Sequence, residues 1–259
     1  MLLIAMAVSA RIAEAGDAPY FALPMELESD FGASNGNATL LRFMPLYAYP
    51  RKTDWRLIHL SLITLADAPG GTPGRPSNPE PDPDASARAS GLTDFIHASF
   101  YTPARKGNFI WGAGAMMSIP TATDSALGSS KWAAGPALRF TYRKGAWNVG
   151  AFGGHRWSFA GDSGRADVNQ TLIRWTIRRR LGNKWFLVSA PLWTGNFNSP
   201  SSERWLLPMG GGIGRGFTFA DNPWAVSFQV YGNVVKPEGA PDWIARLALI
   251  AAIPMPADA

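Results

Sequence analysis

The stretch WAVSFQVYGNV, from Trp224 to Val234, alternates large apolar side chains with small or polar ones. Successive side chains of an extended strand point to opposite faces, so Val226 and Phe228 share the face opposite Gln229. A tilted strand of about 9–11 residues crosses the hydrocarbon core of a bilayer. The stretch therefore predicts a membrane-spanning β-strand, with one face in lipid and the other in a polar interior.

The same alternation recurs along the chain in about twelve segments of about 8–14 residues each. It is clear at 20–28, 131–143 and 169–178. Two other segments, 55–65 and 185–194, carry apolar residues on both faces, which leaves their register open. With 27 Gly and 21 Pro available for turns, this pattern favours an all-β fold.

The connections between these segments alternate strictly between short and long. The short ones lie at 50–54, 103–107, 144–146, 181–184 and 217–223, and the long ones at 29–37, 67–90, 120–130, 158–165, 195–203 and 236–242. Outer-membrane barrels have tight periplasmic turns at one rim and longer external loops at the other. We therefore predict a closed antiparallel transmembrane β-barrel of about 12 strands over residues 16–259, with both termini on the periplasmic side.

Tryptophan marks the ends of the same segments. Seven of the eleven Trp stand at the first residues of a segment: Trp55, Trp132, Trp147, Trp185, Trp205, Trp224 and Trp243. Indole has an apolar body and one N–H donor, so it prefers the boundary between hydrocarbon and water. A soluble β-sandwich, the alternative fold, gives no reason for Trp at strand ends. The placement predicts two aromatic belts around a barrel.

The first residues have features of an export signal. An apolar stretch at 2–10 is followed by Ala13-Glu14-Ala15, a small-x-small cleavage pattern. We predict a signal peptide at 1–15 and export to the bacterial outer membrane; a buried N-terminal strand or helix is the alternative. The chain has no cysteine, and its net charge of +5 comes without a basic run. We therefore predict no disulfide and no nucleic-acid partner.

A series of short motifs resembles a known family. The motifs lie at 91–94, 110–114, 118–123, 127–136, 157–162, 167–170, 204–205, 210–214, 231–237 and 239–243. As an ordered set, they resemble the MetA-pathway phenol-degradation family of bacterial outer-membrane transporters, from about residue 40 to residue 253. The resemblance implies an outer-membrane barrel that passes small compounds, aromatic ones among them, and that has outer-membrane lipids and the barrel-assembly machinery as partners. It implies no catalytic residues.

Charged and polar side chains fall on the predicted inward faces. We expect the lumen to be lined by Arg42, Arg139, Arg143, Arg156, Arg174, Arg178, Gln229, Arg246, Glu26 and Glu28. Closure of the sheet would bring Arg246 beside the two glutamates, which predicts an ion pair across the seam; the alternative is that each points into water. The arginines would favour acidic solutes, or else they only pair with carboxylates.

The 67–90 connection holds six prolines and three acidic residues between 69 and 84. Proline has no N–H for a β-ladder, so this Pro-rich segment cannot pair as a strand. We expect a loop on the external side. The alternative is that the segment folds inward as an acidic constriction against the luminal arginines.

Catalytic, cofactor and metal sites are not expected. His97-Ala98-Ser99 puts a base and a nucleophile on one face of a strand, so a lipid hydrolase is one alternative function. The three histidines lie in different segments, and the glycines at 210–216 fit no nucleotide-binding spacing. The prediction is a passive channel for small solutes through an Arg-lined lumen, with no enzymatic activity. A structural barrel with a closed lumen is the other alternative.

Overall fold

The computed structural model describes residues 20–50, 55–69, 88–103 and 107–254. The predicted signal peptide and most of the Pro-rich loop lie outside these residues. No helix in the described part of the chain has the length and hydropathy to cross a membrane. The described residues include two 3₁₀-helices, η1 (Ser125–Leu127) and η2 (Ser201–Glu203). The strands are β1 (Tyr20–Phe31), β2 (Thr39–Phe43), β3 (Leu46–Pro50), β4 (Trp55–Pro69), β5 (Arg88–Leu92), β6 (Phe95–Pro103), β7 (Phe109–Ile119), β8 (Lys131–Lys144), β9 (Trp147–Gly161), β10 (Asn169–Gly182), β11 (Trp185–Ser189), β12 (Leu192–Asn196), β13 (Trp205–Phe219), β14 (Asn222–Val235) and β15 (Trp243–Pro254).

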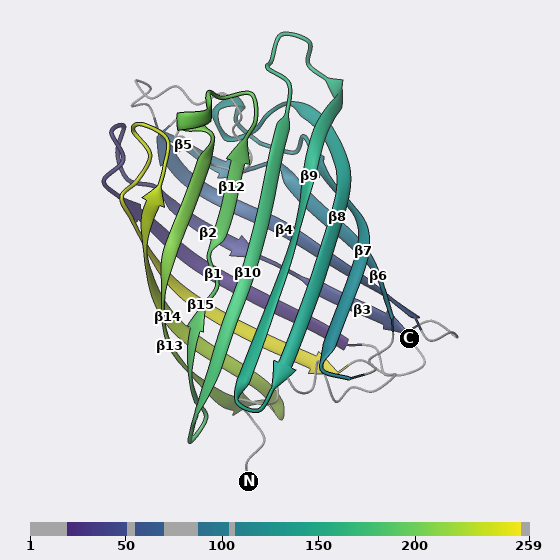
Figure 1. Cartoon of the computed structure of the whole chain (residues 1–259). Coiled ribbons are helices and arrows are strands. Elements are labelled where there is room, and N and C mark those ends of the chain that lie inside the picture. The colour runs from purple at the N-terminus through teal and green to yellow at the C-terminus, as the bar shows by residue number, and fades with distance from the viewer. Residues whose placement is uncertain (1–19, 51–54, 70–87, 104–106, 255–259) are drawn as a thin grey trace.

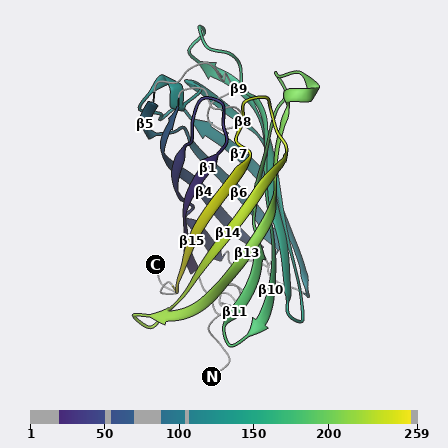
Figure 2. The ribbon, with the colours of Figure 1, turned by 90° about the vertical axis from the view of Figure 1, so that its left-hand side faces the viewer.

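The sheet closes on itself because the last strand pairs with the first (Figures 1 and 2). At this seam Glu28 of β1 lies opposite Arg246 of β15. All pairings in the described residues are antiparallel, and apart from the seam they join strands that are near in the chain. Three barrel strands are each interrupted once, so that β2 continues as β3, β5 as β6, and β11 as β12. The described residues thus form a closed barrel of twelve strands, which confirms the predicted fold class.

Proline accounts for two of the three interruptions. Pro45 follows β2 and Pro191 precedes β12, and neither has an N–H for the ladder. The third interruption is at Asp94, whose carboxylate accepts hydrogen bonds from N and Oγ of Ser129, both at 2.7 Å. These bonds tie the wall of the barrel to the loop at 120–130.

The two rims differ as predicted. At one rim, which we call the short-turn rim, two turns place non-glycine residues at positive φ: Asn183 (45°) with Lys184 (68°), and Ala220 (47°) with Asp221 (60°). This pair of left-handed residues is the type I′ geometry, whose twist matches that of the flanking strands. At the other rim, the long-loop rim, the described connections at 32–38, 120–130, 162–168, 197–204 and 236–242 are all longer.

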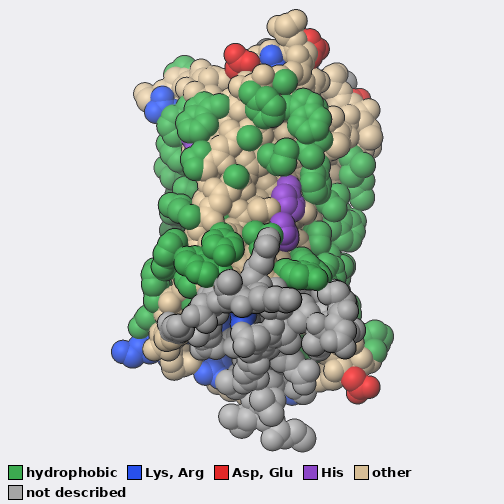
Figure 3. All heavy atoms as spheres, turned by 90° about the vertical axis from the view of Figure 1, so that its right-hand side faces the viewer, with side chains coloured by type: hydrophobic (Ala, Val, Ile, Leu, Met, Phe, Trp, Pro, Cys, Tyr) green, Lys and Arg blue, Asp and Glu red, His purple; other side chains and the backbone are tan. Residues whose placement is uncertain are grey.

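The outer wall is apolar and the inward face is buried, in the predicted alternation. Phe228 is 55% exposed on the outside, whereas Gln229 and Tyr231 on the inward side are almost fully buried. Apolar side chains cover much of the wall in Figure 3. The structure also settles the two open registers. Phe186 of β11 and Ile58 of β4 point inward, and their outward neighbours include Leu187 and His59.

Tryptophan lies near both rims of the barrel. Trp55, Trp111, Trp147, Trp185 and Trp224 lie in the strand ends at the short-turn rim. Trp132, Trp157, Trp193, Trp205 and Trp243 lie in the strand ends at the long-loop rim. An apolar wall between two such belts is suited to the hydrocarbon of a bilayer.

A charge placed on the middle of the outer wall tests this arrangement. Leu138 is 66% exposed at the midpoint of β8, and Val234 is equally exposed but close to the long-loop end of β14. Leu138→Arg should cost about 2–4 kcal/mol of folding stability in lipid, and Val234→Arg about 0–1 kcal/mol. The measurement is urea unfolding of barrels folded into lipid vesicles. Equal costs at the two positions would contradict a membrane midplane at Leu138.

Candidate functional site

The centre of the barrel interior holds five charged side chains, which we call the luminal ion network: Glu26, Glu28, Arg42, Arg174 and Arg246. All are at most 7% exposed. Arg246 donates to Oε2 of Glu28 from Nη2 at 2.7 Å and from Nε at 2.9 Å, and Nη1 of Arg42 lies 2.7 Å from the same oxygen. The ion pair that the sequence predicts across the seam is therefore present.

One ion pair of this network crosses the lumen. Arg174 belongs to β10, which lies across the barrel from β1 (Figure 1). Its guanidinium group forms a bidentate ion pair with Glu26, in which Nη1 donates to Oε2 at 3.0 Å and Nη2 donates to Oε1. Nε of Arg246 lies 3.6 Å from Glu26 Oε2, so Glu26 contacts arginines from both sides of the barrel. Side chains from facing walls thus meet at mid-height.

Polar side chains from neighbouring strands complete the hydrogen bonding of the network. Nη1 of Arg246 donates to the carbonyl oxygen of Ala190 at 2.6 Å, and its guanidinium carbon lies 4.9 Å from the ring centroid of Tyr231. The Tyr231 hydroxyl donates to Gln229 and accepts from the backbone N–H of Ala190 at 2.9 Å. A buried charge is tolerated when it is paired and its remaining donors are satisfied. For Arg246 that condition is met by partners from β1, β14 and the β11–β12 interruption.

The other candidate residues lie inward but apart from the network. Arg156 is 1% exposed, donates from Nη2 to Gln170 at 3.2 Å, and has no hydrogen-bond partner for Nε among the described residues. Arg178 is buried with its guanidinium carbon 4.3 Å from the centroid of Phe186. Arg139 and Arg143 are half-buried on the inward face of β8, toward the short-turn rim.

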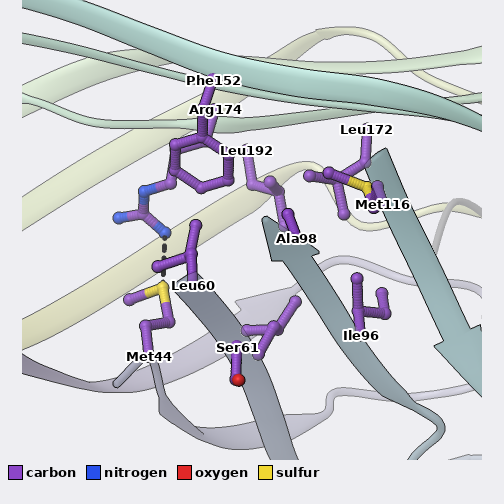
Figure 4. A pocket seen from close by; sticks show the side chains of 11 residues that line it. Met44, Leu60, Ser61, Ile96, Ala98, Met116, Phe152, Leu172, Arg174 and Leu192 are labelled. Carbon is purple, nitrogen blue, oxygen red and sulfur yellow. Dashed lines mark hydrogen bonds between the residues drawn. The ribbon is translucent and has the colours of Figure 1, made fainter. Parts of the chain in front are cut away.

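One side of the lumen is apolar, a feature that the alternation along the chain does not predict. Ile58, Ile96, Phe100, Met116 and Leu172 form a buried cluster inside the barrel. A cavity of about 20 Å³, enough for one water molecule, lies between this cluster and Arg174 (Figure 4). Met44 also lines this cavity, and its Sδ lies 3.5 Å from Nη1 of Arg174. Arg174 therefore separates an apolar half of the lumen from the charged half.

The loop at 120–130 covers part of the interior at the long-loop rim. Leu127 of η1 is 4% exposed and packs with a buried cluster that includes the inward residues Leu40 and Ala66. Arg165 of the next loop holds it there, because its Nη2 donates to the carbonyl oxygens of Ser125 at 3.0 Å and Gly128 at 2.7 Å. The loop therefore forms an inward lid above the luminal ion network.

The same rim carries an ion pair between the buried Lys131 and the exposed Asp167. Asp167 accepts a hydrogen bond from Oγ of Ser158 at 2.9 Å, and Nζ of Lys131 lies 3.4 Å away. The Ser158 hydrogen bond and the Lys131 ammonium hold the pKa of the Asp167 carboxyl below its ordinary value. The carboxylate thus stays charged at neutral pH. Its ion pair with Lys131 holds the 162–168 loop against the first residue of β8, at the long-loop rim.

Buried charge in the lumen is unequal in sign. Six basic side chains and four carboxylates are buried in the described residues: Arg42, Lys131, Arg156, Arg174, Arg178 and Arg246 against Glu26, Glu28, Asp30 and Asp94. Toward the short-turn rim the inward charges are arginines, including Arg56, Arg139 and Arg143. Among the buried side chains of the described residues, basic groups therefore outnumber carboxylates, and the luminal ion network itself is almost inaccessible to water.

Comparisons with known proteins support the fold. No protein-family model matches the sequence, and no curated protein matches it. Among solved structures, the chain is similar to the COG4313 outer membrane channel from Pseudomonas putida F1, with TM-score 0.62 and 15% identity over 92% of this chain and 96% of that chain. It is more distantly similar to the P. putida toluene transporter TodX, with TM-score 0.43 and 10% identity over 95% and 92% of the two chains. At 15% identity, the first similarity shows a shared outer-membrane-type barrel fold. The TM-score of the second is too low to support a conclusion about this chain.

Proposed function

We propose that this barrel resides in the bacterial outer membrane and acts as a channel for small acidic solutes. The observation that supports it most is the combination of an apolar outer wall with a closed-barrel interior in which buried basic side chains outnumber buried carboxylates. Hydrocarbon suits the wall, and guanidinium groups in a narrow lumen attract anions. The similarity to a solved outer-membrane channel is in keeping with this role.

The lumen also suggests which acids would suit it. Arg174, the member of the luminal ion network on β10, borders an apolar cluster that contains Leu172 and against which Phe152 packs. A solute with a carboxylate and a small apolar or aromatic body would meet suitable groups on both sides. We therefore include in the proposal the MetA-pathway phenol-degradation family that the motifs resemble, and phenolic acids as the class of solute to examine first.

Uptake into vesicles tests the solute class. Liposomes with and without the protein are loaded with a pH-sensitive dye and mixed with benzoate or 4-hydroxybenzoate, with propionate as an aliphatic acid and methylammonium as a cation. The proposal requires faster entry of the aromatic acids through the protein than of the cation. Equal rates for acid and cation would contradict it.

A structural barrel with a permanently closed lumen is the second candidate, because the luminal ion network occludes the centre in this structure. The two differ in conductance. Purified protein in a planar bilayer should show discrete current steps if it is a channel that opens. No steps at any applied voltage, from protein that is shown to be folded, would favour the structural barrel.

Ion selectivity is expected to depend on the inward arginines near the short-turn rim. Arg139→Gln with Arg143→Gln removes two positive charges from the lumen, and the preference for Cl⁻ over K⁺ should fall. Arg179→Gln with Arg215→Gln is the matched control, because both arginines are exposed at the same rim on the outer wall, over Trp147 and Trp185. The readout is the reversal potential in a KCl gradient. A cation-selective wild type, or an equal shift from the control, would overturn the assignment.

A further inference from the structure

Four polar side chains form a cluster on the outer wall, where the surrounding surface is apolar. His59 and Ser61 come from β4, and His97 and Ser99 come from β6; the strand register places His59 opposite Ser99 and Ser61 opposite His97. We call them the outer-wall His–Ser cluster. They share the outward face with the exposed Tyr101, and Figure 3 shows histidine on the wall with apolar side chains around it.

The position of the cluster calls for an explanation. On the next strand, the outward residues paired with His97 and Ser99 are Met117 and Ala115, so no polar side chain continues the cluster there. Imidazole facing hydrocarbon is costly, and ionisable residues at such depth mark functional sites. Ser99 lies two residues, or about 7 Å along the strand, from Tyr101 in the aromatic belt. That depth is just inside the belt, close to where lipid ester groups lie.

The hydrogen bonds within the cluster have the pattern of an activated nucleophile. Oγ of Ser99 lies 3.1 Å from Nε2 of His97 and 2.9 Å from Nδ1 of His59. Nδ1 of His97 lies 2.9 Å from Oγ of Ser61. With both rings neutral, Nδ1–H of His97 donates to Ser61, which leaves its Nε2 to accept the Ser99 proton. A nucleophile bonded to a base, and a base oriented by a third group, is the arrangement of hydroxyl-dependent acyl transfer.

His59 supplies what such a site further requires. In the same proton arrangement its Nδ1–H donates to Ser99 Oγ, and the two imidazole nitrogens that flank Ser99 are 3.4 Å apart. An N–H donor at this place would reach the oxygen that becomes negative when Ser99 adds to a carbonyl group. The β-ladder engages the backbone N–H groups of these strands, so a side chain has to provide the donor.

We propose that the outer-wall His–Ser cluster is an esterase site for the acyl ester bonds of membrane glycerophospholipids. Oγ of Ser99 bonds to the ester carbonyl carbon while its proton passes to Nε2 of His97, and His59 donates to the oxyanion. The bond to the glycerol oxygen then breaks, and His97 returns the proton to that oxygen, which leaves as a lysophospholipid. Water, deprotonated by His97, hydrolyses the acyl–Ser99 ester and releases a fatty acid. The net reaction consumes one ester and one water.

This activity goes beyond the proposed channel and is independent of it. The substrate reaches Ser99 sideways from the membrane and never enters the lumen, and no residue of the luminal ion network takes part. It takes up the alternative function that the spacing of His97 and Ser99 in the sequence leaves open. Loss of one function therefore leaves the other intact, which keeps the two proposals separable.

The test uses the full-length protein folded into vesicles of phosphatidylethanolamine and phosphatidylglycerol. Fatty-acid release is followed over time, and a long-chain alkyl fluorophosphonate is added to trap the nucleophile for peptide mass spectrometry. We expect release above protein-free vesicles and a label on Ser99. Ser99→Ala should reduce release to background, and His97→Asn or His59→Asn should reduce it about 10²–10⁴-fold.

Matched controls separate chemistry from folding. Ser29→Ala removes a serine from the outward register of β1, far from the cluster, and should leave release unchanged. Heat-modifiable gel mobility shows whether each variant is folded. Absence of release and of label in folded wild-type protein would overturn the proposal, and so would release that persists in Ser99→Ala.

Discussion

Glu28→Gln is expected to destabilise the barrel by about 3–5 kcal/mol, since it leaves buried guanidinium groups without their carboxylate. Oε2 of Glu28 receives both Arg42 and Arg246, each at 2.7 Å. Gln keeps the size of the side chain but donates where a carboxylate would accept. In this variant Arg246 keeps its hydrogen bond to the Ala190 carbonyl oxygen and its 3.6 Å contact with Glu26. Most of the lost stability therefore comes from Arg42, which loses the carboxylate that neutralises it.

The measurement is equilibrium unfolding in urea from short-chain phosphatidylcholine vesicles, followed by Trp emission. Glu238→Gln is the control, because it makes the same chemical change on an exposed residue of a long-loop connection. Adding Arg42→Met to Glu28→Gln removes the stranded charge and should recover part of the stability. A loss below about 1 kcal/mol, typical of an exposed pair, would show that water reaches the network.

The barrel follows from local patterns that the sequence displays openly. Alternation in β14 identifies its lipid-facing residues, and the lengths of the connections identify the two rims. Closure then brings β1 and β15 together, and the contact between Glu28 and Arg246 follows from their inward positions alone. Each inference needs one strand, or one pair of strands that must be neighbours.

Contacts that depend on unresolved registers could not be predicted. In β4 both faces are apolar, so nothing in the sequence decides whether Ile58 or Leu57 points inward. The apolar half of the lumen and the meeting of His59 with Ser99 both depend on that choice. His97 and Ser99 are visible as a pair in the sequence, but their partners on β4 are not.

Contacts across the lumen are equally hidden. Arg174 and Glu26 are separated by most of the chain, and no ladder joins β10 to β1. Whether such side chains meet depends on the diameter of the barrel and on what fills the space between them. The inward fold of Leu127 is likewise a property of loop packing, and the sequence of the loop gives no periodicity from which to infer it.

The cross-lumen pair leads to the second large effect, which is on conductance. Arg174→Ala removes the side chain that bridges to Glu26, so a passage should open between the charged and apolar halves of the lumen. The barrel should still fold, because Glu26 keeps Arg246 as a counter-charge. We expect a severalfold larger single-channel conductance than in the wild type, measured in planar bilayers at fixed KCl concentration.

Arg180→Ala is the charge-matched control for this experiment. Arg180 lies on the same strand, but its Nη2 donates to the Gly145 carbonyl at the short-turn rim, away from the constriction. Its removal changes the net charge equally and should leave the conductance near the wild-type value. If the two variants conduct alike, charge and not occlusion determines the current. If Arg174→Ala conducts no better than the wild type, the pathway is closed elsewhere, with the lid around Leu127 as the next place to open.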